Sequence, residues 1–232
     1  MIFNLLKKIK FLLTRTSFSQ AGEDAIIRYL FADYGLSKIS YLDLGTNSPD
    51  YGNNTYWFYL NNSTGVCVEA DSSLINRIKK VRTNDIVLNL GVSTSYEKEE
   101  YFYIFNQPDL NTFNELEAIE KAKSGKYKIL SKKLVSLVSI NTILEKYFTN
   151  CPDLLSIDIE GLDLDVLKSL DFNKYPIKVI CAETCLYSEN HIRSKNINLI
   201  QFMETKNYEV YGTTYINTIF VNKDWFYKKN NV

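Results

Sequence analysis

The chain has 232 residues, of which 27 are basic and 27 acidic, so its formal net charge is zero. This length suits one large α/β domain, and a hydrophobic fraction of 45% is enough for a buried core. A nucleic-acid-binding surface needs an excess of basic residues, which this composition excludes. We therefore expect a globular protein with no nucleic-acid partner.

Residues 1–18 are predicted to form an amphipathic helix ahead of a single domain over residues 19–232. Apolar residues recur at helical spacing, while Lys7, Lys8 and Lys10 form an opposite basic face. The lysines interrupt the apolar run, so the segment resembles neither a signal peptide nor a membrane span. We expect the helix to dock on the domain's own core. Peripheral contact with an anionic membrane, or with a partner subunit in a homo-oligomer, is the alternative.

Beyond residue 20, short β-branched runs alternate with helical segments, and the last two strands are joined by residues 212–214 alone. Strands are expected at residues 39–44, 65–70, 85–90, 153–159, 177–183, 208–211 and 215–221. Helices are expected at residues 23–34, 55–60, 74–80, 140–148, 164–170 and 193–206. The alternation predicts an α/β fold with a mostly parallel seven-stranded sheet. A connection as short as 212–214 requires a C-terminal antiparallel hairpin, as in the Rossmann-like outline of class I methyltransferases.

Between residues 97 and 133 the regular alternation breaks. A charged strand is expected at residues 98–106, followed by an acidic and then a lysine-rich segment. The charged side chains are Glu115, Glu117, Glu120, Lys121, Lys123, Lys126, Lys128, Lys132 and Lys133. Long connections in compact domains are usually functional lids or mobile excursions. Residues 107–130 are accordingly interpreted as either a lid or a solvated loop.

The first strand ends in the run YLDLGTN, in which Asp43 precedes Gly45 and Asn47. The carboxyl ends of strands form the ligand crevice of an open α/β sheet, and a glycine there lets the backbone approach a ligand closely. The turn lacks the Gly-x-Gly-x-x-Gly pattern of dinucleotide-binding proteins and continues into Pro49. It therefore favours the amino-acid part of S-adenosylmethionine over a pyrophosphate.

The second strand ends in VEAD, which places Glu69 and Asp71 two residues apart. An acidic residue at this position binds the ribose hydroxyls of an adenosine ligand. We assign Glu69 to the ribose and Asp71 to the cap of the following helix. The third strand leads into Gly91, where the adenine ring would lie.

The fourth strand ends in SIDIEG, with Asp158 and Glu160 before a glycine. Buried carboxylates are costly without a partner, so two of them at a strand end indicate function. Asp158 is expected where a methyl donor and an acceptor hydroxyl meet, with Glu160 and Glu183 as a base, a substrate anchor or metal ligands. Oxygen ligands such as Asp158 and Glu183 would favour Mg²⁺ or Mn²⁺. Versions with and without a metal both stay open.

Histidine and cysteine contribute little to the predicted chemistry. His191 lies in a loop after the fifth strand, where it can act as a base or stay an idle surface residue. The four cysteines form no Cys-x-x-Cys pair, which argues against a zinc site. We interpret them as the reduced thiols of a cytoplasmic protein.

Eight motifs in order resemble the FkbM family of methyltransferases and span residues 19–222. They are SQAGED, YLDLGTNSP, NNTYWFY, VEAD, LNLGVS, SIDIEGLDLDVLKSL, AET and TYINTIFV. The resemblance implies the class I methyltransferase fold, S-adenosylmethionine as donor, and O-methylation of sugars or natural products. The cofactor set that it implies is Gln20, Asp43, Gly45, Asn47, Glu69, Ala70, Gly91 and Asp158. The residues implied to face the acceptor are Asn53, Asn54, Thr55 and Asn217.

The resulting hypothesis is methyl transfer from S-adenosylmethionine to a sugar hydroxyl of a sugar nucleotide or a glycan or capsule precursor. Residues 121–133 are rich in lysine and would meet a pyrophosphate. The alternatives are a small natural product or lipid as acceptor, and a non-catalytic protein that only binds the cofactor. A nicotinamide-dependent dehydrogenase would need the missing glycine pattern.

Overall fold

The computed structural model describes residues 16–94, 98–107, 110–123, 125–159, 161–185 and 194–228. Most of the predicted N-terminal helix lies outside the described residues, and so do Glu160 and His191. In the part of the chain that is described, no helix is both long enough and apolar enough to cross a membrane.

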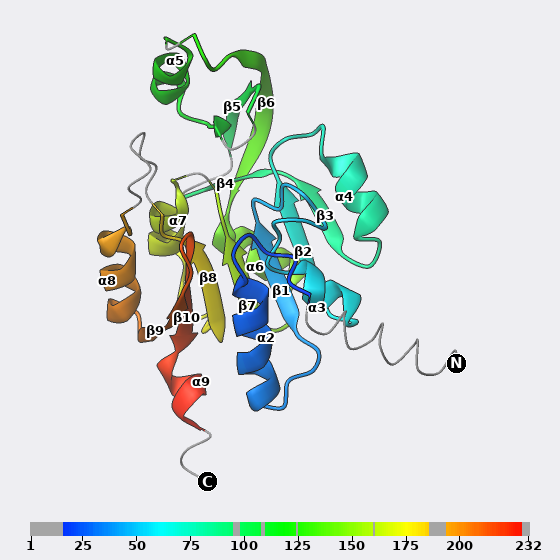
Figure 1. The fold of residues 1–232 in the computed structure, drawn as a ribbon, viewed down its shortest axis with the longest axis vertical. Coiled ribbons are helices and arrows are strands. Elements are labelled where there is room, and N and C mark those ends of the chain that lie inside the picture. The colour runs from blue at the N-terminus through cyan, green and yellow to red at the C-terminus, as the bar shows by residue number, and fades with distance from the viewer. Residues whose placement is uncertain are drawn as a thin grey trace.

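A seven-stranded sheet forms the centre of the molecule (Figure 1), in the order β3-β2-β1-β7-β8-β10-β9. Its strands are β1 (Ser40–Leu44), β2 (Thr64–Glu69), β3 (Ile86–Asn89), β7 (Leu154–Ile157), β8 (Val179–Glu183), β9 (Tyr208–Thr213) and β10 (Asn217–Asn222). Five strands are parallel, and β10 pairs antiparallel with both β8 and β9. The predicted fold and its C-terminal hairpin are therefore confirmed.

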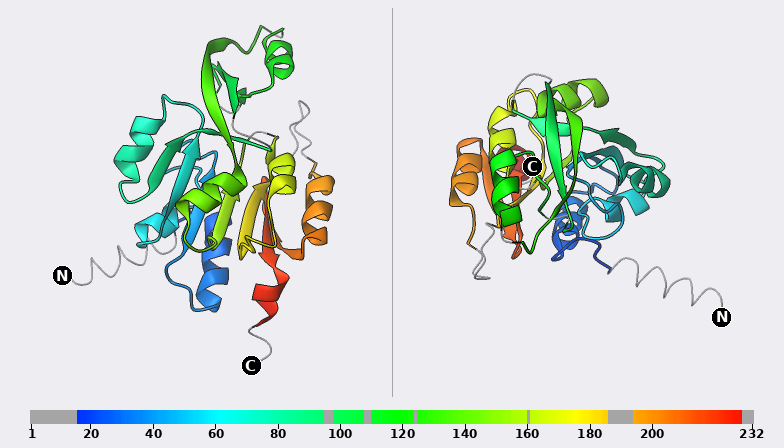
Figure 2. Two further views of the ribbon diagram at one scale, coloured as in Figure 1. Left: turned by 180° about the vertical axis from the view of Figure 1, so that it is seen from behind. Right: turned by 90° about the horizontal axis from the view of Figure 1, so that it is seen from above.

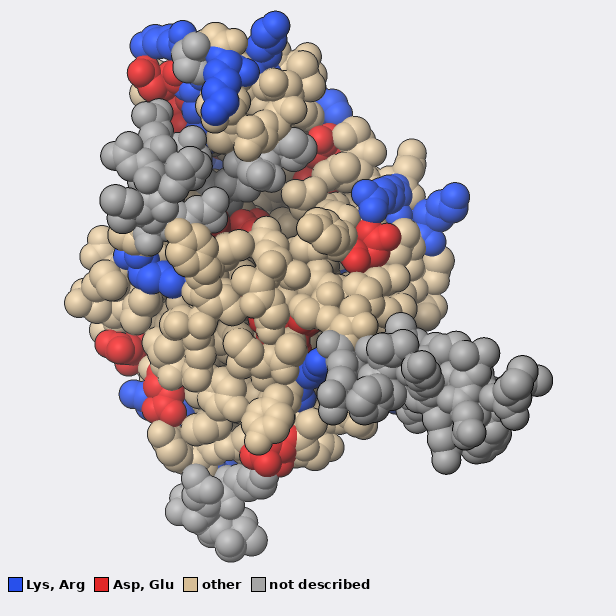
Figure 3. Space-filling view, viewed as in Figure 1, with Lys and Arg blue, Asp and Glu red and all other residues tan. Residues whose placement is uncertain are grey.

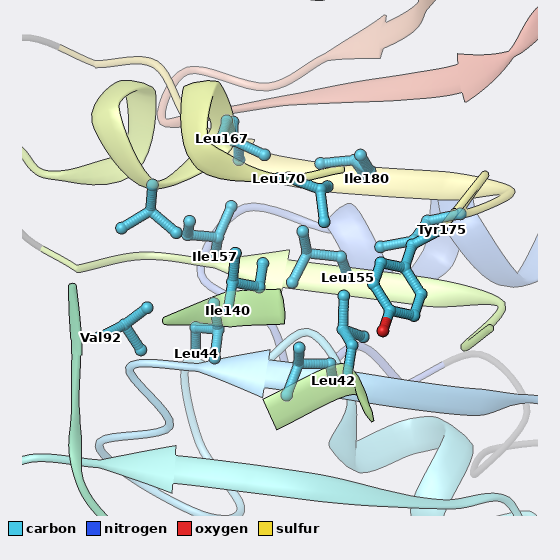
Figure 4. Packing of buried hydrophobic residues seen from close by; sticks show 14 of the residues in the cluster. Leu42, Leu44, Val92, Ile140, Leu155, Ile157, Leu167, Leu170, Tyr175 and Ile180 are labelled. Atoms are coloured by element: carbon cyan, nitrogen blue, oxygen red, sulfur yellow. The ribbon is translucent and has the colours of Figure 1, made fainter. Parts of the chain in front are cut away.

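Helices cover both faces of this sheet because its central strands are apolar on both sides. One face packs against α6 (Ile140–Tyr147), α7 (Asp163–Ser169) and α8 (Ile197–Thr205). Figure 4 shows Leu42 and Leu44 of β1 on this face among side chains of β7 and α6. The other face, which carries Tyr41, packs against α2 (Glu23–Asp33), α3 (Tyr56–Leu60) and α9 (Lys223–Tyr227).

The described part of residues 98–139 forms two strands and a helix, where the sequence predicted one strand followed by a lid or a loop. These residues contain β5 (Lys98–Phe105), α5 (Glu115–Lys123) and β6 (Ile129–Ser139), and we call them the cap. β5 runs antiparallel to β6, and β4 (Gly91–Ser93) pairs with β6 to complete a second sheet. Two views show the cap standing at one end of the main sheet (Figures 1 and 2).

The sequence gives no clear strand pattern for β6, because only part of one face of this strand is buried. Val135 and Leu137 are buried, while Leu130, Lys132 and Leu134, which precede them, are exposed. The two adjacent lysines also break the alternation that marks a half-buried strand. The outer end of the cap carries a group of basic side chains, seen at the top of Figure 3.

Three further boundaries differ from expectation. α8 begins at Ile197, because the side chain of Asn196 caps it by accepting a hydrogen bond from the backbone N–H of Leu199 at 3.2 Å. β9 continues to Thr213, so the hairpin turn follows later than residues 212–214. α4 (Ile75–Val81) begins one residue later than predicted, beside β3.

Candidate active site

A cavity of about 850 Å³ lies at the carboxyl edge of the main sheet. The ends of four parallel strands line it through Asp43, Glu69, Asp158 and Glu183. The cap contributes lining residues from β5, from the connection after it and from α5, among them Phe102, Leu110, Asn111, Phe113, Glu117 and Lys121. The volume is in the range of pockets that enclose a drug-sized ligand, so the cavity can enclose a cofactor with part of an acceptor.

Gly45 is required by close packing as well as by its backbone conformation. Its φ is +80°, and a Cβ atom placed on it would lie 1.8 Å from the backbone oxygen of Asp158. Asn47 follows with a φ of 48°. The first turn and the end of β7 are thus in direct backbone contact, which fixes Asp158 relative to the turn.

Glu69 connects the turn that follows β1 to the turn that follows β2. Its Oε2 accepts a hydrogen bond from the backbone N–H of Asn47 at 2.8 Å, and its Oε1 accepts one from that of Asp71 at 2.7 Å. Burial raises the pKa of the Glu69 carboxyl, and these two hydrogen bonds oppose the rise. The carboxylate lines the cavity while its acceptor capacity is only partly used.

Asp71 acts in the turn before α4 and is not the helix cap. Its Oδ1 accepts from the backbone N–H of Ser73 at 2.9 Å and from Lys133 Nζ of the cap at 3.2 Å, whereas Leu74 is the N-cap residue. These bonds lower the pKa of Asp71 despite its burial, which acts in the opposite direction. Asp71 therefore ties the cap to the main sheet.

Ala70 and Gly91 lie where the cap meets the main sheet. Both line the cavity. A Cβ atom on Gly91 would lie 2.2 Å from Leu137 Cδ2 and 2.6 Å from Phe113 Cζ. Gly91 therefore leaves room for the side chains of Leu137 and Phe113 to pack against this edge, a reason that the sequence did not indicate.

Residues 53–55 lie over a row of side chains that crosses the sheet. The register aligns Cys67, Asp43, Ser156 and Cys181 across β2, β1, β7 and β8. Asp43 Oδ2 accepts from Asn53 Nδ2 at 2.9 Å and lies 2.9 Å from Thr55 Oγ1. Asn54 Nδ2 donates to Ser156 Oγ at 3.1 Å.

Of the four residues predicted to face the acceptor, only some line the cavity. Asn53 and Asn54 line the cavity, but Thr55 is fully buried beneath it. Asn54 Oδ1 is buried without a hydrogen-bond partner among the described residues. Asn217 is also buried, where its Nδ2 donates to Glu23 Oε1 at 3.0 Å. Asn53 and Asn54 are thus the two of this set that border the cavity.

Glu23 joins the SQAGED motif to the C-terminal hairpin. Burial raises its pKa, but hydrogen bonds from Thr214, Asn217 and the backbone of Ala21 outweigh that effect and leave the pKa below its usual value. Gln20 of the same motif lines the cavity. Lys195 lies nearby and donates to Thr184 Oγ1 at 3.0 Å, and burial lowers the pKa of its ammonium group.

Asp158 and Glu183 end neighbouring strands and line the same cavity, together with Asp163 at the start of α7. Burial, followed by the charge of Asp158, raises the pKa of Asp163 to about 8. The described residues include no cluster of three or more His, Cys, Asp or Glu side chains with the arrangement of a metal site. Glu160, which was predicted to act with Asp158, and His191, which was predicted in a loop after the fifth strand, lie outside the described residues.

Sequence reasoning missed the cap side chains in the cavity as well as Asp163. Phe102 and Phe113 pack against each other with ring centroids 4.6 Å apart, and both line the cavity. Their placement depends on the β5–β6 pairing, so no local pattern reveals it. Asp163 was hidden in the helical run LDLDVLKSL, where acidic residues in a first turn are usual.

The strand order, with its C-terminal antiparallel hairpin and a cavity at the carboxyl edge, defines the class I methyltransferase fold. A model of the methyltransferase FkbM domain matches residues 43–210, more than half of the chain. The chain therefore belongs to the FkbM methyltransferase family. It is a methyltransferase that depends on S-adenosylmethionine.

Comparison with solved structures found remote likenesses. One is a methyltransferase from Geobacter sulfurreducens, with 10% identity, coverage of 84% of this chain and 76% of that chain, and a TM-score of 0.42. Another is a TehB-like SAM-dependent methyltransferase from Corynebacterium glutamicum, with 9% identity, 95% and 97% coverage, and a TM-score of 0.40. An O-methyltransferase from Bacillus cereus in complex with SAH has 12% identity, 93% and 86% coverage, and a TM-score of 0.40. No curated protein matches the chain.

Proposed function

We propose that this methyltransferase transfers a methyl group from S-adenosylmethionine to a hydroxyl group of a sugar, carried by a sugar nucleotide or a glycan precursor. The observation that carries this proposal is the pair Asp158 and Glu183. These two carboxylates end adjacent strands and line the same cavity as Glu69. A sugar hydroxyl is a weak acid, so a carboxylate base beside the donor is the group that its methylation needs.

The residues around the cavity fit S-adenosylmethionine. Glu69 offers an acceptor carboxylate for the two ribose hydroxyls, and the first turn at Gly45 and Asn47 faces the same space. Leu90, Val92 and Phe102 supply apolar surface for the adenine ring. When bound, the cofactor supplies an electrophilic methyl group on a sulfonium. The protein then has to orient the acceptor, exclude water and accept a proton.

In this proposal Asp158 accepts the proton of the acceptor hydroxyl. Its backbone contact with Gly45 holds it in a fixed relation to the first turn, and alignment of this kind can lower a barrier by about 7–11 kcal/mol in favourable models. Glu183 anchors a second hydroxyl group of the acceptor. Asn54 supports a hydroxyl-bearing acceptor, because its buried Oδ1 has no partner among the described residues and can accept a hydrogen bond.

The acceptor class has further support in the polar side chains of the cap. Asn111, Thr112 and Glu117 line the cavity opposite the sheet edge. Within the lysine-rich stretch, Lys121 lines the cavity and pairs with Glu117 at 2.8 Å. Lys121 is therefore the residue of this stretch that would meet the pyrophosphate of a sugar nucleotide. A cytoplasmic location belongs to the proposal as well, supported by four cysteines without a disulfide.

Replacement of Asp158 by asparagine tests the proposal. Asp158→Asn keeps the size of the side chain but removes the charge that accepts a proton. We expect turnover to fall by about 10²-fold or more with a much smaller loss of cofactor affinity. Product formation from a panel of sugar nucleotides and glycan precursors is measured by mass spectrometry, with Asp165→Asn on the exposed side of α7 as control.

The same experiment separates the alternatives. Wild-type turnover by Asp158→Asn would reassign the base to Glu183 or to Glu160. Methylation of lipids or small natural products in place of sugars would overturn the acceptor class, and binding without any methyl transfer would indicate a non-catalytic protein. A metal held by Asp158 and Glu183 predicts that a chelator reproduces the Asp158→Asn defect and that Mg²⁺ or Mn²⁺ reverses it. A direct base predicts resistance to the chelator.

A further inference from the structure

Arg82, the residue that follows α4, is completely buried beneath the cofactor end of the cavity. A buried guanidinium is costly unless most of its donors are satisfied. Its Nε donates to Asp85 Oδ2 at 2.9 Å, its Nη1 donates to the backbone oxygen of Pro49 at 3.3 Å, and its Nη2 donates to Thr55 Oγ1. The rings of Tyr41, Tyr56 and Tyr59 surround it, with centroids 5.0 to 5.5 Å from Cζ.

Two of these contacts reach the segment 45–55, which forms one wall of the cavity. The segment contains neither a strand nor a helix, and Gly45, Asn47 and Gly52 have positive φ. Its shape therefore depends on contacts with other parts of the chain. Its two ends are held by backbone hydrogen bonds of Thr46 and Asn53, and Arg82 holds its middle through Pro49.

Thr55 connects the guanidinium of Arg82 to the cavity wall through hydrogen bonds. Its hydroxyl accepts from Arg82, so its single hydrogen is left to point toward Asp43 Oδ2 and Asn53 Oδ1, both 2.9 Å away. Asp43 and Asn53 line the cavity, whereas Arg82 and Thr55 do not. Arg82 Nη2 is also 4.0 Å from Asp43 Oδ2. Burial raises the pKa of Asp43, and the charge of Arg82 is the largest effect that opposes the rise.

We propose that Arg82 and Thr55 are positioning residues, which hold the segment 45–55 and the Asp43 carboxylate in the arrangement that binds the cofactor. Neither residue touches the ligand. Both act by fixing the wall before the ligand arrives, so that binding does not have to order the segment. The inference rests on the cofactor site proposed above.

Thr55 gives the sharpest test, because valine has the shape of threonine without its hydroxyl. Thr55→Val should weaken the binding of S-adenosylhomocysteine by about 10-fold or more, since Asp43 and Asn53 lose their shared donor. Thr55→Ser, which restores the hydroxyl, should bind within about 2-fold of wild type. Affinity is measured by calorimetric titration, and folding by thermal unfolding of each variant.

Tyr41→Phe is the matched control inside the same buried cluster. It deletes the hydrogen bonds from the Tyr41 hydroxyl to Asp85, at 2.7 and 2.8 Å, on the side of Arg82 away from the segment. It should lower the melting temperature and leave affinity for S-adenosylhomocysteine unchanged. Arg82→Lys keeps the charge but cannot reach Pro49, Thr55 and Asp85 together, so it should weaken binding as Thr55→Val does.

Glu69→Gln distinguishes failure of this inference from failure of the proposed site. If Thr55→Val binds like wild type while Glu69→Gln binds weakly, Arg82 and Thr55 serve stability alone and the inference is wrong. If both variants bind like wild type, the cofactor site itself is misplaced. Equal losses of affinity in Thr55→Val and Thr55→Ser would also overturn the inference, because they would show that the hydroxyl is not the element that matters.

Discussion

Individual side chains at the edge of the sheet have two tasks, since they build the cavity wall as well as face the ligand. Glu69 shows this clearly, because both of its oxygens already accept backbone hydrogen bonds from the turns on either side. Gly45 similarly combines a positive φ with backbone contact to Asp158. A substitution at such a residue changes stability and binding together, so variants have to be chosen that separate the two effects.

Glu69→Gln separates the effect on binding from the effect on stability better than Glu69→Ala does. Alanine leaves the backbone N–H groups of Asn47 and Asp71 unpaired, at about 1–3 kcal/mol each. Glutamine keeps one acceptor oxygen but loses the charge, so cofactor affinity should fall by about 10-fold or more. Calorimetric titration with S-adenosylhomocysteine measures the loss. Unchanged affinity in the glutamine variant would remove Glu69 from the ribose site.

Gly45→Ala should be far more destabilising than the same change at Gly35. Both glycines have positive φ, which costs an alanine about 1–2 kcal/mol. A Cβ atom at Gly35 meets no atom within 4 Å, whereas at Gly45 it would lie 1.8 Å from the Asp158 backbone oxygen. Urea unfolding of the two variants measures the difference, which is the effect of displacing the end of β7. Equal losses of stability would show that the turn can relax without moving Asp158.

Among the elements, the cap is the one that lines the cavity from outside the main sheet and its helices. It is built from β5, β6 and α5, and it brings apolar and polar side chains to the cavity opposite the sheet edge. Its attachment is narrow. Three residues of β4 pair with β6, Lys133 bonds to Asp71, and Gly91 lets Leu137 and Phe113 approach closely. A small attached element that covers a cavity is suited to open and close over it.

Hydrogen exchange tests whether the cap behaves as a lid. Ala118 is the one buried residue of α5. The amides of α5 should therefore exchange faster than those of β1 and β7 in the free protein. Cofactor and acceptor together should slow exchange in residues 110–123, because Leu110, Phe113 and Lys121 line the cavity. The core strands serve as an internal control. Identical exchange in the free and the bound protein would reduce the segment to a static wall.

For the molecule as a whole, acidic groups near the cavity couple stability to pH. Asp163 is buried, and its pKa lies at about 8 in the folded protein against 3.8 for the free side chain. Between these values the folded protein keeps a proton that the unfolded chain has released. Its contribution to stability is therefore complete at low pH and is lost as the pH rises from about 4 to about 8.

Asp163→Asn should remove this dependence, because asparagine has the shape of the protonated acid and does not ionise. The variant should become more stable than wild type as the pH is raised from about 5 to about 8, as measured by urea unfolding. Asp165→Asn on the same helix is the control, since Asp165 is exposed and pairs with Lys168. A constant difference between Asp163→Asn and wild type over this range would show that Asp163 is ionised throughout.

The sequence determined the main sheet, its strand boundaries to within a few residues and the family. These features follow from local patterns, since apolar runs that end in Asp43, Glu69, Asp158 and Glu183 mark strands whose carboxyl ends meet at one edge. The residues at that edge therefore converge on one cavity, as their spacing indicated. Their individual roles stay predictions.

The tertiary structure alone decided the cap and the buried polar network. β6 pairs with β5 across a long connection, and its half-exposed pattern gives no strong local signal. Arg82 lies just after Lys79 and Lys80 at a helix end, a position typical of a surface charge. It is nevertheless fully buried, because Thr55 and Pro49 from another part of the chain join the nearby Asp85 around it. Burial of a charge depends on partners that only the folded chain assembles, and no local period encodes them.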